Sequence, residues 1–332
     1  MEIKIDLFFL ILCSFIFFYF GGKISIKFKL LDYPNRRKMH KYPIPFSGGL
    51  IISIIFLITV YLSNFNEFYN NNILVYGFLV ALFGLIDDKF NVNVGSKLIL
   101  QLLPILILVY LNQLKIDTLI GFPFLGDINL GSFNYIFTIL CVYLLLNSSN
   151  YLDGIDGLLS ISFLISLIFL FIFIDEKNFE LKNFITYLII PVVIFLLFNF
   201  GLFNLPKIFL GNSGSQLLGY ILAFTIISSY INYNVDLGIL IWLLSFQVYE
   251  FISINLIRFQ KRKNIFKPAK DHIHHLIFNK SKSIFLTNII LLFVQIILIT
   301  YGSIVNIFFG QEISISFFVI LFFIFYILRK KL

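Results

Sequence analysis

The chain contains repeated apolar runs that are long enough to cross a lipid bilayer, and this pattern constrains its fold more than any other feature. A helix needs about 20 mostly apolar residues to span the hydrocarbon core of a membrane. Of the 332 residues, 59% are hydrophobic and only 13% are charged, whereas a soluble domain carries about a quarter charged residues. The sequence therefore predicts an all-α, polytopic integral membrane protein with a single transmembrane domain over residues 1–332.

The apolar runs predict about eleven membrane-spanning helices. Their ranges are 7–22, 49–63, 73–86, 98–112, 133–149, 158–174, 184–203, 214–230, 237–257, 284–301 and 313–328. The first run lacks a basic leading segment and a small-residue cleavage site, so we expect it to be retained as a helix. An odd number of spans places the two termini on opposite faces of the membrane.

Basic residues gather in one set of loops and orient the helices. All 25 Lys and Arg lie on this face except Lys4, Lys115, Lys177 and Lys182. The positive-inside rule then places the N-terminus outside and the C-terminus in the cytoplasm. Because this topology accounts for most of the net charge of +8, the charge does not indicate nucleic-acid binding.

Ionisable residues also cluster on the predicted cytoplasmic face, in loops near 23–49, 87–97, 147–158, 204–215 and 258–283. Every histidine lies there, together with the acids Asp32, Asp87, Asp88, Asp153, Asp156, Glu250 and Asp271. Ionisable groups at the membrane edge are costly, so a cluster on one face predicts a functional site. A transporter more often places such groups near the bilayer midplane.

The first motif is the loop LDYPNRRKMHKYPIPFSGGL, residues 31–50. Its basic cluster includes Lys38, and its prolines hold the loop extended. Gly48 and Gly49 then open a helix, where bare backbone N–H groups can receive an anion. The alternative is a positive-inside loop that contacts anionic lipid headgroups.

The second motif is GLIDDKFNVNVGSK, residues 84–97, in which Asp87 and Asp88 end an apolar helix. Adjacent carboxylates repel each other, and a divalent cation, a shared proton or Lys89 would relieve the repulsion. One carboxyl group with a raised pKa could act as a general base. The alternative, a simple charged helix end, is weakened because the helix dipole opposes negative charge at a C-terminus.

The third motif is NSSNYLDGIDGLLS, residues 147–160. It places an amide or carboxylate at every third position, namely Asn147, Asn150, Asp153 and Asp156. These oxygens would align along one side of a helix or tight turn, and such donors suit Mg²⁺. Turn chemistry around the two glycines is the alternative.

The fourth motif is FLGNSGSQLLGY, residues 209–220, which includes Asn212 and precedes an apolar helix. Its glycines and serines can cradle a phosphate through backbone N–H and hydroxyl groups. A helix cap formed by Ser or Asn explains the segment equally well.

The fifth motif is KPAKDHIHHLI, residues 267–277, with His272, His274 and His275. Histidines bind transition metals or donate hydrogen bonds to phosphate oxygens, and zinc is disfavoured because no thiolate lies nearby in sequence. Glu250, at the inner end of the ninth apolar run, is predicted to pair with Arg258 or to cap the site.

Taken together and in this order, the five motifs resemble the MraY/WecA superfamily of polyprenyl-phosphate N-acetylhexosamine-1-phosphate transferases (glycosyltransferase family 4). The matching pieces are DYPNRRKMHKYPIPFSGG, IDDKFN, NSSNYLDGIDGL, FLGNSGS and DHIHH. The spaced HIHH form is similar to the WecA/TagO-like branch. This resemblance implies a multi-pass enzyme of the bacterial inner (cytoplasmic) membrane whose active site lies on the cytoplasmic face.

The resemblance also implies the reaction: transfer of a sugar 1-phosphate from a UDP-amino sugar to undecaprenyl phosphate, with release of UMP. The cofactor would be Mg²⁺, with Mn²⁺ as a substitute, and the product would begin a lipid-linked glycan such as O-antigen, capsule or a wall polymer. Catalytic roles fall on Asp87 (as base or covalent nucleophile), Asp88, His272, His274 and His275. Asn150 and Asn212 match metal ligands, and substrate contacts fall on Lys38, Lys97, Asn147, Asp153 and Asp156.

Three positions depart from the family's pattern. Asn212 stands where the family usually has a metal-binding Asp, which removes a negative charge and weakens metal binding. Asn91 replaces the third acid of the common DDxxD form, and Ala269 with Lys270 replace an acidic–Arg pair. We predict an active enzyme with altered metal affinity. A non-catalytic relative and a lipid or sugar transporter are the alternatives, and the composition allows a monomer or a homodimer.

Overall fold

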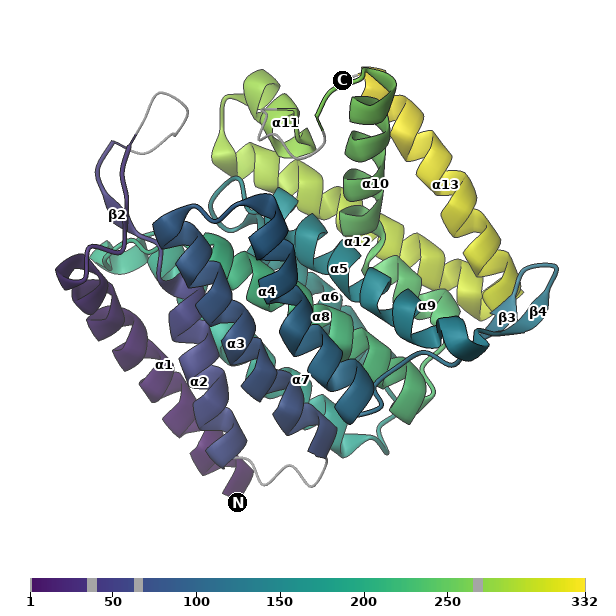
Figure 1. The fold of residues 1–332 in the computed structure, drawn as a ribbon, viewed down its shortest axis with the longest axis horizontal. Helices are drawn as coiled ribbons and strands as arrows, with labels where there is room; N and C mark the ends of the chain where they lie inside the picture. The colour runs from purple at the N-terminus through teal and green to yellow at the C-terminus, as the bar shows by residue number, and fades with distance from the viewer. Residues whose placement is uncertain (1, 35–40, 63–67, 265–270, 332) are drawn as a thin grey trace. The chain divides into compact units, whose positions relative to one another are not determined.

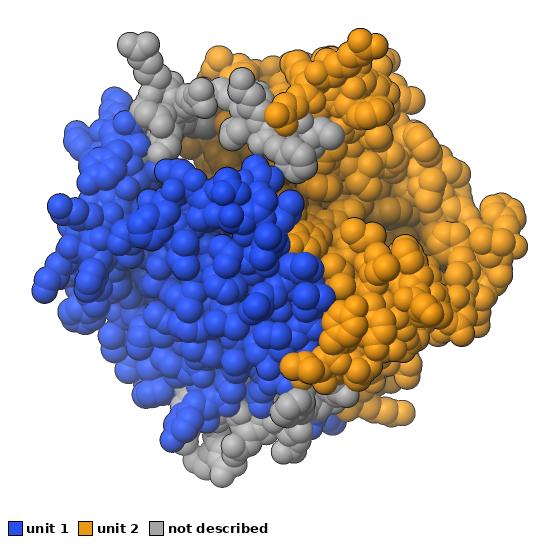
Figure 2. All heavy atoms as spheres, in the orientation of Figure 1, with its two compact units in different colours: residues 1–108, 179–221 blue, residues 109–178, 222–332 orange. Residues whose placement is uncertain are grey.

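The computed structural model describes residues 2–34, 41–62, 68–264 and 271–331. The chain folds into two compact units (Figure 2). Unit 1 contains residues 1–108 and 179–221, and unit 2 contains residues 109–178 and 222–332. Each unit therefore combines segments from both halves of the sequence.

Unit 1 is a helical bundle that carries a short two-stranded sheet (Figure 1). Its helices are α1 (Glu2–Lys27), α2 (Gly48–Leu62), α3 (Phe68–Phe90), α4 (Val94–Leu106), α7 (Phe179–Asn199) and the first part of α8 (Gly211–Tyr233). Helix α2 packs against α1, α3 and α7, and α3 packs against α4. Strands β1 (Leu31–Asp32) and β2 (Ile44–Pro45) pair antiparallel between α1 and α2 in the sequence. A 3-10 turn, η3 (Leu202–Asn204), precedes α8.

Unit 2 is a second helical bundle, with a hairpin at the start of its chain segment (Figure 1). Its helices are α5 (Asn134–Leu152), α6 (Leu158–Phe173), the rest of α8, α9 (Leu237–Leu243), α10 (Ser245–Gln260), α11 (Ile273–Ser281), α12 (Ile284–Phe309) and α13 (Gln311–Lys331). Helix α12 packs against α6, α9, α11 and α13. The hairpin consists of β3 (Thr118–Phe122) and β4 (Gly126–Asn129) and is followed by the 3-10 turn η2 (Gly131–Phe133). A π-helical turn, η1 (Ile107–Leu111), continues α4 into this unit.

The helices have the length and composition of membrane spans. Within the described residues, seven helices are long and apolar enough to cross a bilayer, or eight if α9 and α10 form one broken span. Large apolar side chains such as Phe8, Phe293 and Phe308 are exposed on these helices, and such a surface is stable in lipid but not in water. The prediction of an all-α polytopic membrane protein is confirmed, and the count of eleven spans stays a prediction.

The apolar run 237–257, predicted as one helix, is broken in the structure. Helix α9 ends before Leu244, α10 begins after it, and their axes differ by 65°. The carbonyl of Trp242 accepts a hydrogen bond from Ser245 Oγ at 2.7 Å, and that of Leu243 accepts one from Ser166 Oγ at 2.7 Å. Backbone groups released by a break in apolar surroundings require such partners. Hydropathy alone carries no information about these hydroxyl groups.

Candidate functional site

Two adjacent carboxylates at the end of α3 form the centre of a polar cluster in unit 1. Asp87 is only 9% exposed although it follows an apolar helix. Lys97, in the first turns of α4, places its Nζ 2.8 Å from Asp87 Oδ2. A buried carboxylate is stabilised by an opposite charge at this distance. The second motif therefore compensates its own charge through a lysine on the following helix.

The turn between α3 and α4 sets the position of Lys97. Asn93 caps α4, with its Oδ1 accepting a hydrogen bond from the backbone N–H of Ser96 at 2.9 Å. Lys89, which the sequence offered as a partner for the two carboxylates, places its Nζ 5.6 Å from the centroid of the Phe90 ring. The ion pair that the structure shows with Asp87 comes instead from Lys97.

The start of α8 completes the cluster by binding both carboxylates. Asn212 donates its backbone N–H to Asp88 Oδ1 at 3.1 Å, and Ser213 donates its backbone N–H to Asp88 Oδ2 at 3.3 Å. The side-chain amide of Asn212 donates to Asp87 Oδ2 at 3.1 Å. Helix N-termini bind anions in this way. Two of the N–H groups expected to cradle a phosphate thus bind a carboxylate of the chain itself.

Glycines allow α3 and the start of α8 to approach closely enough for these bonds. A Cβ atom added to Gly84 would lie 2.5 Å from Ser213 Cα. Gly211 has a φ of +73°, and a Cβ atom there would lie 2.7 Å from Asp88 Oδ2 and 2.5 Å from the Phe46 carbonyl oxygen. Any side chain at these two positions would separate the carboxylate from its backbone donors.

Helix α2 approaches the start of α8 equally closely, and this overturns one prediction. A Cβ atom on Gly49 would lie 1.9 Å from the backbone N of Gly214. Gly48 and Gly49 donate their N–H groups to the carbonyls of Phe209 and Leu210, each at 2.9 Å. The expectation that these N–H groups receive an anion is therefore wrong. The two glycines instead permit contact between backbones.

The environment of Asp88 changes its acidity. Burial raises the pKa of Asp88 to about 7, and the negative charge of Asp87 acts in the same direction. The N–H donors of Asn212 and Ser213 and the charge of Lys97 lower that pKa, without offsetting burial. A carboxyl group with a pKa near 7 changes protonation around neutral pH, as groups that handle protons do.

A second polar cluster, in unit 2, surrounds the start of α11. Ile273, the first residue of α11, donates its backbone N–H to Glu250 Oε1 at 2.9 Å. Arg329, near the end of α13, binds the same carboxylate, with Nε 2.6 Å from Oε2 and Nη2 2.9 Å from Oε1. Its Nη2 also donates to the carbonyl oxygen of Asp271 at 2.9 Å. Glu250 thus joins three helices, α10, α11 and α13.

Ion pairs in this cluster differ from one of the predicted pairings. Arg258 binds Asp271 in a bidentate manner, with Nε 3.0 Å from Oδ2 and Nη2 2.6 Å from Oδ1. Glu250 pairs with Arg329 instead. The predicted Glu250–Arg258 pair is therefore wrong, because the guanidinium group of Arg258 binds the Asp271 carboxylate instead. The alternative, that Glu250 caps the site, agrees with its bond to the first N–H of α11.

The three histidines of the DHIHH motif lie together at this helix start. The ring centroids of His272 and His274 are 5.6 Å apart with nearly parallel planes, and those of His274 and His275 are 4.2 Å apart. His274 is 1% exposed, and among the described residues neither of its ring nitrogens has a hydrogen-bond partner. Buried polar atoms without a protein partner are usually bonded to water, an ion or a ligand.

Two of the histidines, His272 and His274, are held in their neutral form. Burial lowers the pKa of His272 to about 4, and the positive charge of Arg258 lowers it further. Burial also lowers the pKa of His274 well below its usual value, assisted by the neighbouring His275. A neutral imidazole has one N–H donor and one acceptor nitrogen. At neutral pH these rings therefore offer directed hydrogen bonds without a fixed positive charge.

The third motif lies at the end of α5 in the same unit. Asn147 and Asn150 lie in the last turns of α5, whereas Asp153 and Asp156 follow in the turn before α6. Asn288 of α12 donates its Nδ2 to the carbonyl oxygen of Asp156 at 2.8 Å. The four polar residues, spaced three positions apart, therefore extend from the end of α5 into the turn that follows it.

Gly154 brings this turn against the histidines. A Cβ atom on Gly154 would lie 2.0 Å from His274 Nε2, so only glycine fits there. Tyr151 contacts His272 edge to face, with ring centroids 4.7 Å apart. The third and fifth motifs, more than a hundred residues apart in sequence, therefore meet in unit 2.

Comparison with known proteins shows which family the chain resembles. The model of the family described as glycosyl transferase family 4 matches residues 71–230. The match includes Asp87, Asp88, the third motif and Asn212. The chain is therefore similar to glycosyl transferase family 4 over this segment.

Curated proteins resemble the chain over most of its length. The undecaprenyl-phosphate alpha-N-acetylglucosaminyl 1-phosphate transferase of Salmonella typhi is 26% identical over 274 residues, which cover 79% of this chain and 72% of that protein. Proteins of the same name are 28% identical in Yersinia pestis, over 82% of this chain and 76% of the relative, and 25% identical in Escherichia coli (strain K12), over 83% and 77%. The resemblance predicted from the motifs is confirmed.

The structure places the predicted site residues in two groups. Unit 1 holds Asp87, Asp88, Lys97 and Asn212. Unit 2 holds Asn147, Asn150, Asp153, Asp156, His272, His274 and His275. Lys38 lies outside the described residues. The two residues matched to metal ligands, Asn150 and Asn212, therefore belong to different units.

Sequence reasoning missed the role of Arg329. In the sequence, Arg329 is indistinguishable from Lys330 and Lys331, because all three fit the basic tail of a positive-inside topology. In the structure the Arg329 side chain is buried on Glu250, whereas Lys330 and Lys331 are exposed. Only the three-dimensional packing of α13 separates them.

Proposed function

We propose that this protein transfers a sugar 1-phosphate, of the N-acetylhexosamine type, from a UDP-amino sugar to undecaprenyl phosphate. Its relatives carry the name of such a transferase. The observation that carries the proposal is the Asp87–Asp88 pair, held between Lys97 and the start of α8 inside the family match. The reaction would be the first membrane step of a lipid-linked glycan such as O-antigen, capsule or a wall polymer.

In the proposed reaction, an oxygen of the lipid phosphate attacks the β-phosphorus of the UDP-sugar. A new P–O bond forms there while the bond from the β-phosphorus to the bridging oxygen breaks, and UMP leaves with that oxygen. Asp87 is the proposed base that takes the proton of the lipid phosphate, with Lys97 beside it. Asp88 has both oxygens engaged by backbone N–H groups of α8, and its proposed task is to position that helix.

The donor atoms of the unit 1 cluster suit the Mg²⁺ ion that the resemblance implies. They are the carboxylate oxygens of Asp87 and Asp88 and the amide oxygen of Asn212, and hard oxygen donors are those that Mg²⁺ prefers and Mn²⁺ accepts. A bound ion would stabilise charge on the transferring phosphates. Asn212 already satisfies Asp87 through its amide N–H, so we expect weaker metal binding than with an Asp. Asn150, in unit 2, keeps its own proposed role as a metal ligand.

The unit 2 cluster is proposed to bind the nucleotide and its phosphates. His274 is buried and presents ring nitrogens without partners among the described residues, so it can donate to a phosphate oxygen. His272 and His275 lie beside it. The third motif contacts the same histidines through Gly154, which supports the assignment of the donor nucleotide to Asn147, Asp153 and Asp156.

The proposed topology has eleven spans in a bacterial inner membrane, with the N-terminus outside and both clusters at the cytoplasmic face. The distribution of lysine and arginine supports it, since only four of these 25 residues fall in the loops assigned to the outside. Single cysteines at Lys177 and Lys261 test the orientation through labelling by a membrane-impermeant maleimide in whole cells. We expect labelling at position 177 only. Labelling at position 261 alone would show that the orientation in the membrane is the opposite of the one proposed.

One observation favours a second candidate, a non-catalytic relative of the family. Asn212 supplies a hydrogen bond where the family usually has a charged metal ligand, so the cluster is satisfied without a cation. Such a protein would bind UDP-sugar but would not release UMP.

The deciding experiment measures UMP release by the purified, detergent-solubilised protein. It receives undecaprenyl phosphate and a panel of UDP-amino sugars, with Mg²⁺, with Mn²⁺ or with EDTA. We expect release that depends on both lipid and metal, and no release by an Asp87→Asn variant that elutes like the parent. If the parent released no UMP and the Asn212→Asp variant did, the non-catalytic relative would be favoured. If neither protein released UMP with any donor, the proposed transferase activity would be refuted.

A further inference from the structure

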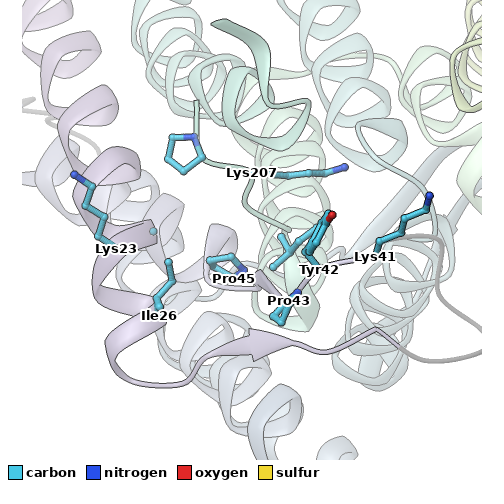
Figure 3. A pocket seen from close by; sticks show the side chains of 10 residues that line it. Lys23, Ile26, Lys41, Tyr42, Pro43, Pro45 and Lys207 are labelled. Atoms are coloured by element: carbon cyan, nitrogen blue, oxygen red, sulfur yellow. The ribbon is translucent and has the colours of Figure 1, made fainter. Parts of the chain in front are cut away.

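A pocket in unit 1 lies outside the residues used so far. It has a volume of about 610 Å³ and is formed by the end of α1, the segment that leads into β2, and the segment that precedes α8 (Figure 3). Lys23 and Ile26 come from α1, Lys41 and Tyr42 from the segment before β2, and Lys207 from the segment before α8. None of the predicted catalytic or metal-binding residues lines it.

The pocket combines positive charge with an apolar lining. Its three cations, Lys23, Lys41 and Lys207, come from segments far apart in sequence, and no carboxylate is among the described residues that line it. The lining given by these described residues therefore carries a net positive charge. Lysines arranged in this way attract a phosphate group.

The orientation of the lysines divides the pocket into two ends. In Figure 3, Lys207 and Lys41 extend toward the same side as the Tyr42 hydroxyl group, whereas Lys23 and Ile26 line the opposite end. The first end thus brings together two ammonium groups and one hydroxyl group. The second end is continuous with the surface of α1.

The walls of the pocket are fixed by backbone hydrogen bonds. Pro45 accepts a hydrogen bond from the backbone N–H of Phe209 at 2.7 Å, and Phe46 donates its N–H to the Leu30 carbonyl at 3.2 Å. Prolines further restrict both segments that meet there. A ligand would therefore enter a site whose walls are already in place, at a small entropic cost.

The surroundings of the pocket match the depth of a lipid headgroup. The apolar part of α1 that could span a membrane ends at Lys27, directly beside the pocket. Exposed apolar side chains occur on the same helix, α1, at Phe20 and Ile24, and in η3 before Lys207, at Leu202 and Phe203, the last of which is 84% exposed. The elements that form the pocket thus also carry exposed apolar surface on which a hydrocarbon tail could pack.

From these observations we propose that the pocket binds the phosphate of an anionic phospholipid from the surrounding leaflet. Lys41, Lys207 and Tyr42 would contact the phosphate, and the acyl chains would lie along Ile26 and the exposed face of α1. Pro45, which lines the pocket, holds the segment that leads to Asn212 through its bond to Phe209. The bound lipid would therefore stabilise the start of α8. This proposal does not depend on the transferase activity, since it concerns binding alone.

The test measures lipid binding by native mass spectrometry of the purified full chain. Phosphatidylglycerol is compared with zwitterionic phosphatidylcholine in the parent and in the triple variant Lys23→Gln, Lys41→Gln, Lys207→Gln. A surface cation contributes about 1 kcal/mol to binding of an anionic lipid, which corresponds to about a fivefold change in affinity per lysine. We expect tight, stoichiometric binding of phosphatidylglycerol only, weakened about 100-fold in the triple variant.

The control variant Lys261→Gln, Lys263→Gln, Lys280→Gln removes the same charge from exposed positions outside the pocket and should retain binding. The proposal would be overturned if the control variant lost phosphatidylglycerol binding to the same extent, or if the parent bound phosphatidylcholine equally well. Displacement of phosphatidylglycerol by inorganic phosphate, which has no acyl chain, would also overturn it. Stoichiometric displacement by undecaprenyl phosphate would also overturn it, because the pocket would then belong to the acceptor lipid. If the triple variant fails to fold, the single variant Lys207→Gln must still show the fivefold loss.

Discussion

The guanidinium group of Arg329 binds both carboxylate oxygens of Glu250, at 2.6 and 2.9 Å, and the two side chains are only 3% and 1% exposed. This pair connects the last turn of α13 to α10. Because Glu250 also binds the first N–H of α11, the end of the chain fixes the helix that carries the three histidines. Removing one partner of a buried ion pair leaves an unpaired buried charge, which costs about 3–5 kcal/mol.

The first prediction concerns this pair. Arg329→Gln should lower the free energy of unfolding by about 3–5 kcal/mol, measured as a fall in the melting temperature of the detergent-solubilised protein. Lys330→Gln removes the same charge at an exposed neighbouring position and should melt like the parent. Similar melting of the two variants would show that the Glu250–Arg329 pair does not hold α11 in place.

The second prediction concerns the contact between Gly154 and His274. Gly154→Ala would place a Cβ atom 2.0 Å from His274 Nε2, so the imidazole must move. Displacement of a positioned group by about 1 Å can reduce turnover about 100-fold, and we expect a loss of that size in UMP release. Gly95→Ala is the matched control, because its Cβ atom would have an ordinary contact at 3.5 Å. Full activity of Gly154→Ala would remove His274 from the proposed site.

The third prediction separates the roles of the two adjacent aspartates. Asp87→Asn removes the proposed base and should reduce UMP release about 10²–10⁴-fold, with a smaller fall in melting temperature than Arg329→Gln because its ion-pair partner Lys97 is 23% exposed. Asp88→Asn removes the carboxylate that accepts two backbone N–H groups of α8, so both turnover and melting temperature should fall. The opposite pattern, with normal turnover in Asp87→Asn, would transfer the role of base to Asp88, whose pKa is raised to about 7 by burial.

The fourth prediction tests Asn212 as a metal ligand. In Asn212→Asp, a third carboxylate would replace the amide that now donates to Asp87 at 3.1 Å. Without metal the variant should melt below the parent because like charges repel, whereas Mg²⁺ should stabilise it more than the parent. UMP release should rise or require less Mg²⁺. Asn204→Asp adds the same charge at an exposed position before α8, and an identical Mg²⁺ response in that variant would discredit the role of Asn212.

The sequence predicted the helices well because hydropathy reports which segments can lie in lipid. It failed at the break between α9 and α10, since the hydroxyl groups that satisfy the released carbonyls of Trp242 and Leu243 come from Ser245 and from Ser166 on another helix. The two small antiparallel sheets were also unexpected. Strands of two to five residues are too short to produce a recognisable alternation of apolar and polar side chains.

For the site, the sequence identified the chemistry of individual residues better than their contacts. Asp87, Asp88 and Asn212 were recognised from local motifs, but their mutual hydrogen bonds join positions about 125 apart. Close backbone approach at Gly84 and Gly49 brings these positions together. A glycine in a sequence does not reveal which backbone it faces, and for the same reason the contact of Gly154 with His274 had no local signal.

The fifth prediction is a dependence of stability on pH that arises from His272. Burial lowers the pKa of His272 in the folded protein to about 4, below its ordinary value of 6.5, so the unfolded chain binds this proton more readily. Its contribution to stability is therefore fully present above about pH 6.5 and is lost as the pH falls toward about 4. The loss is on the order of 3 kcal/mol over that range.

Replacement of His272 by Gln should remove this component of the pH dependence. Asp271 has a lowered pKa, because its bonds to Arg258 outweigh the effect of burial, so it adds a loss of stability on acidification in both proteins. The comparison of parent and His272→Gln melting temperatures between about pH 7.5 and 4.5 isolates the histidine. We expect a shallower decline in the variant. Parallel curves would mean that His272 is solvated in the folded protein, and the proposed neutral histidine site would then have to rest on His274 alone.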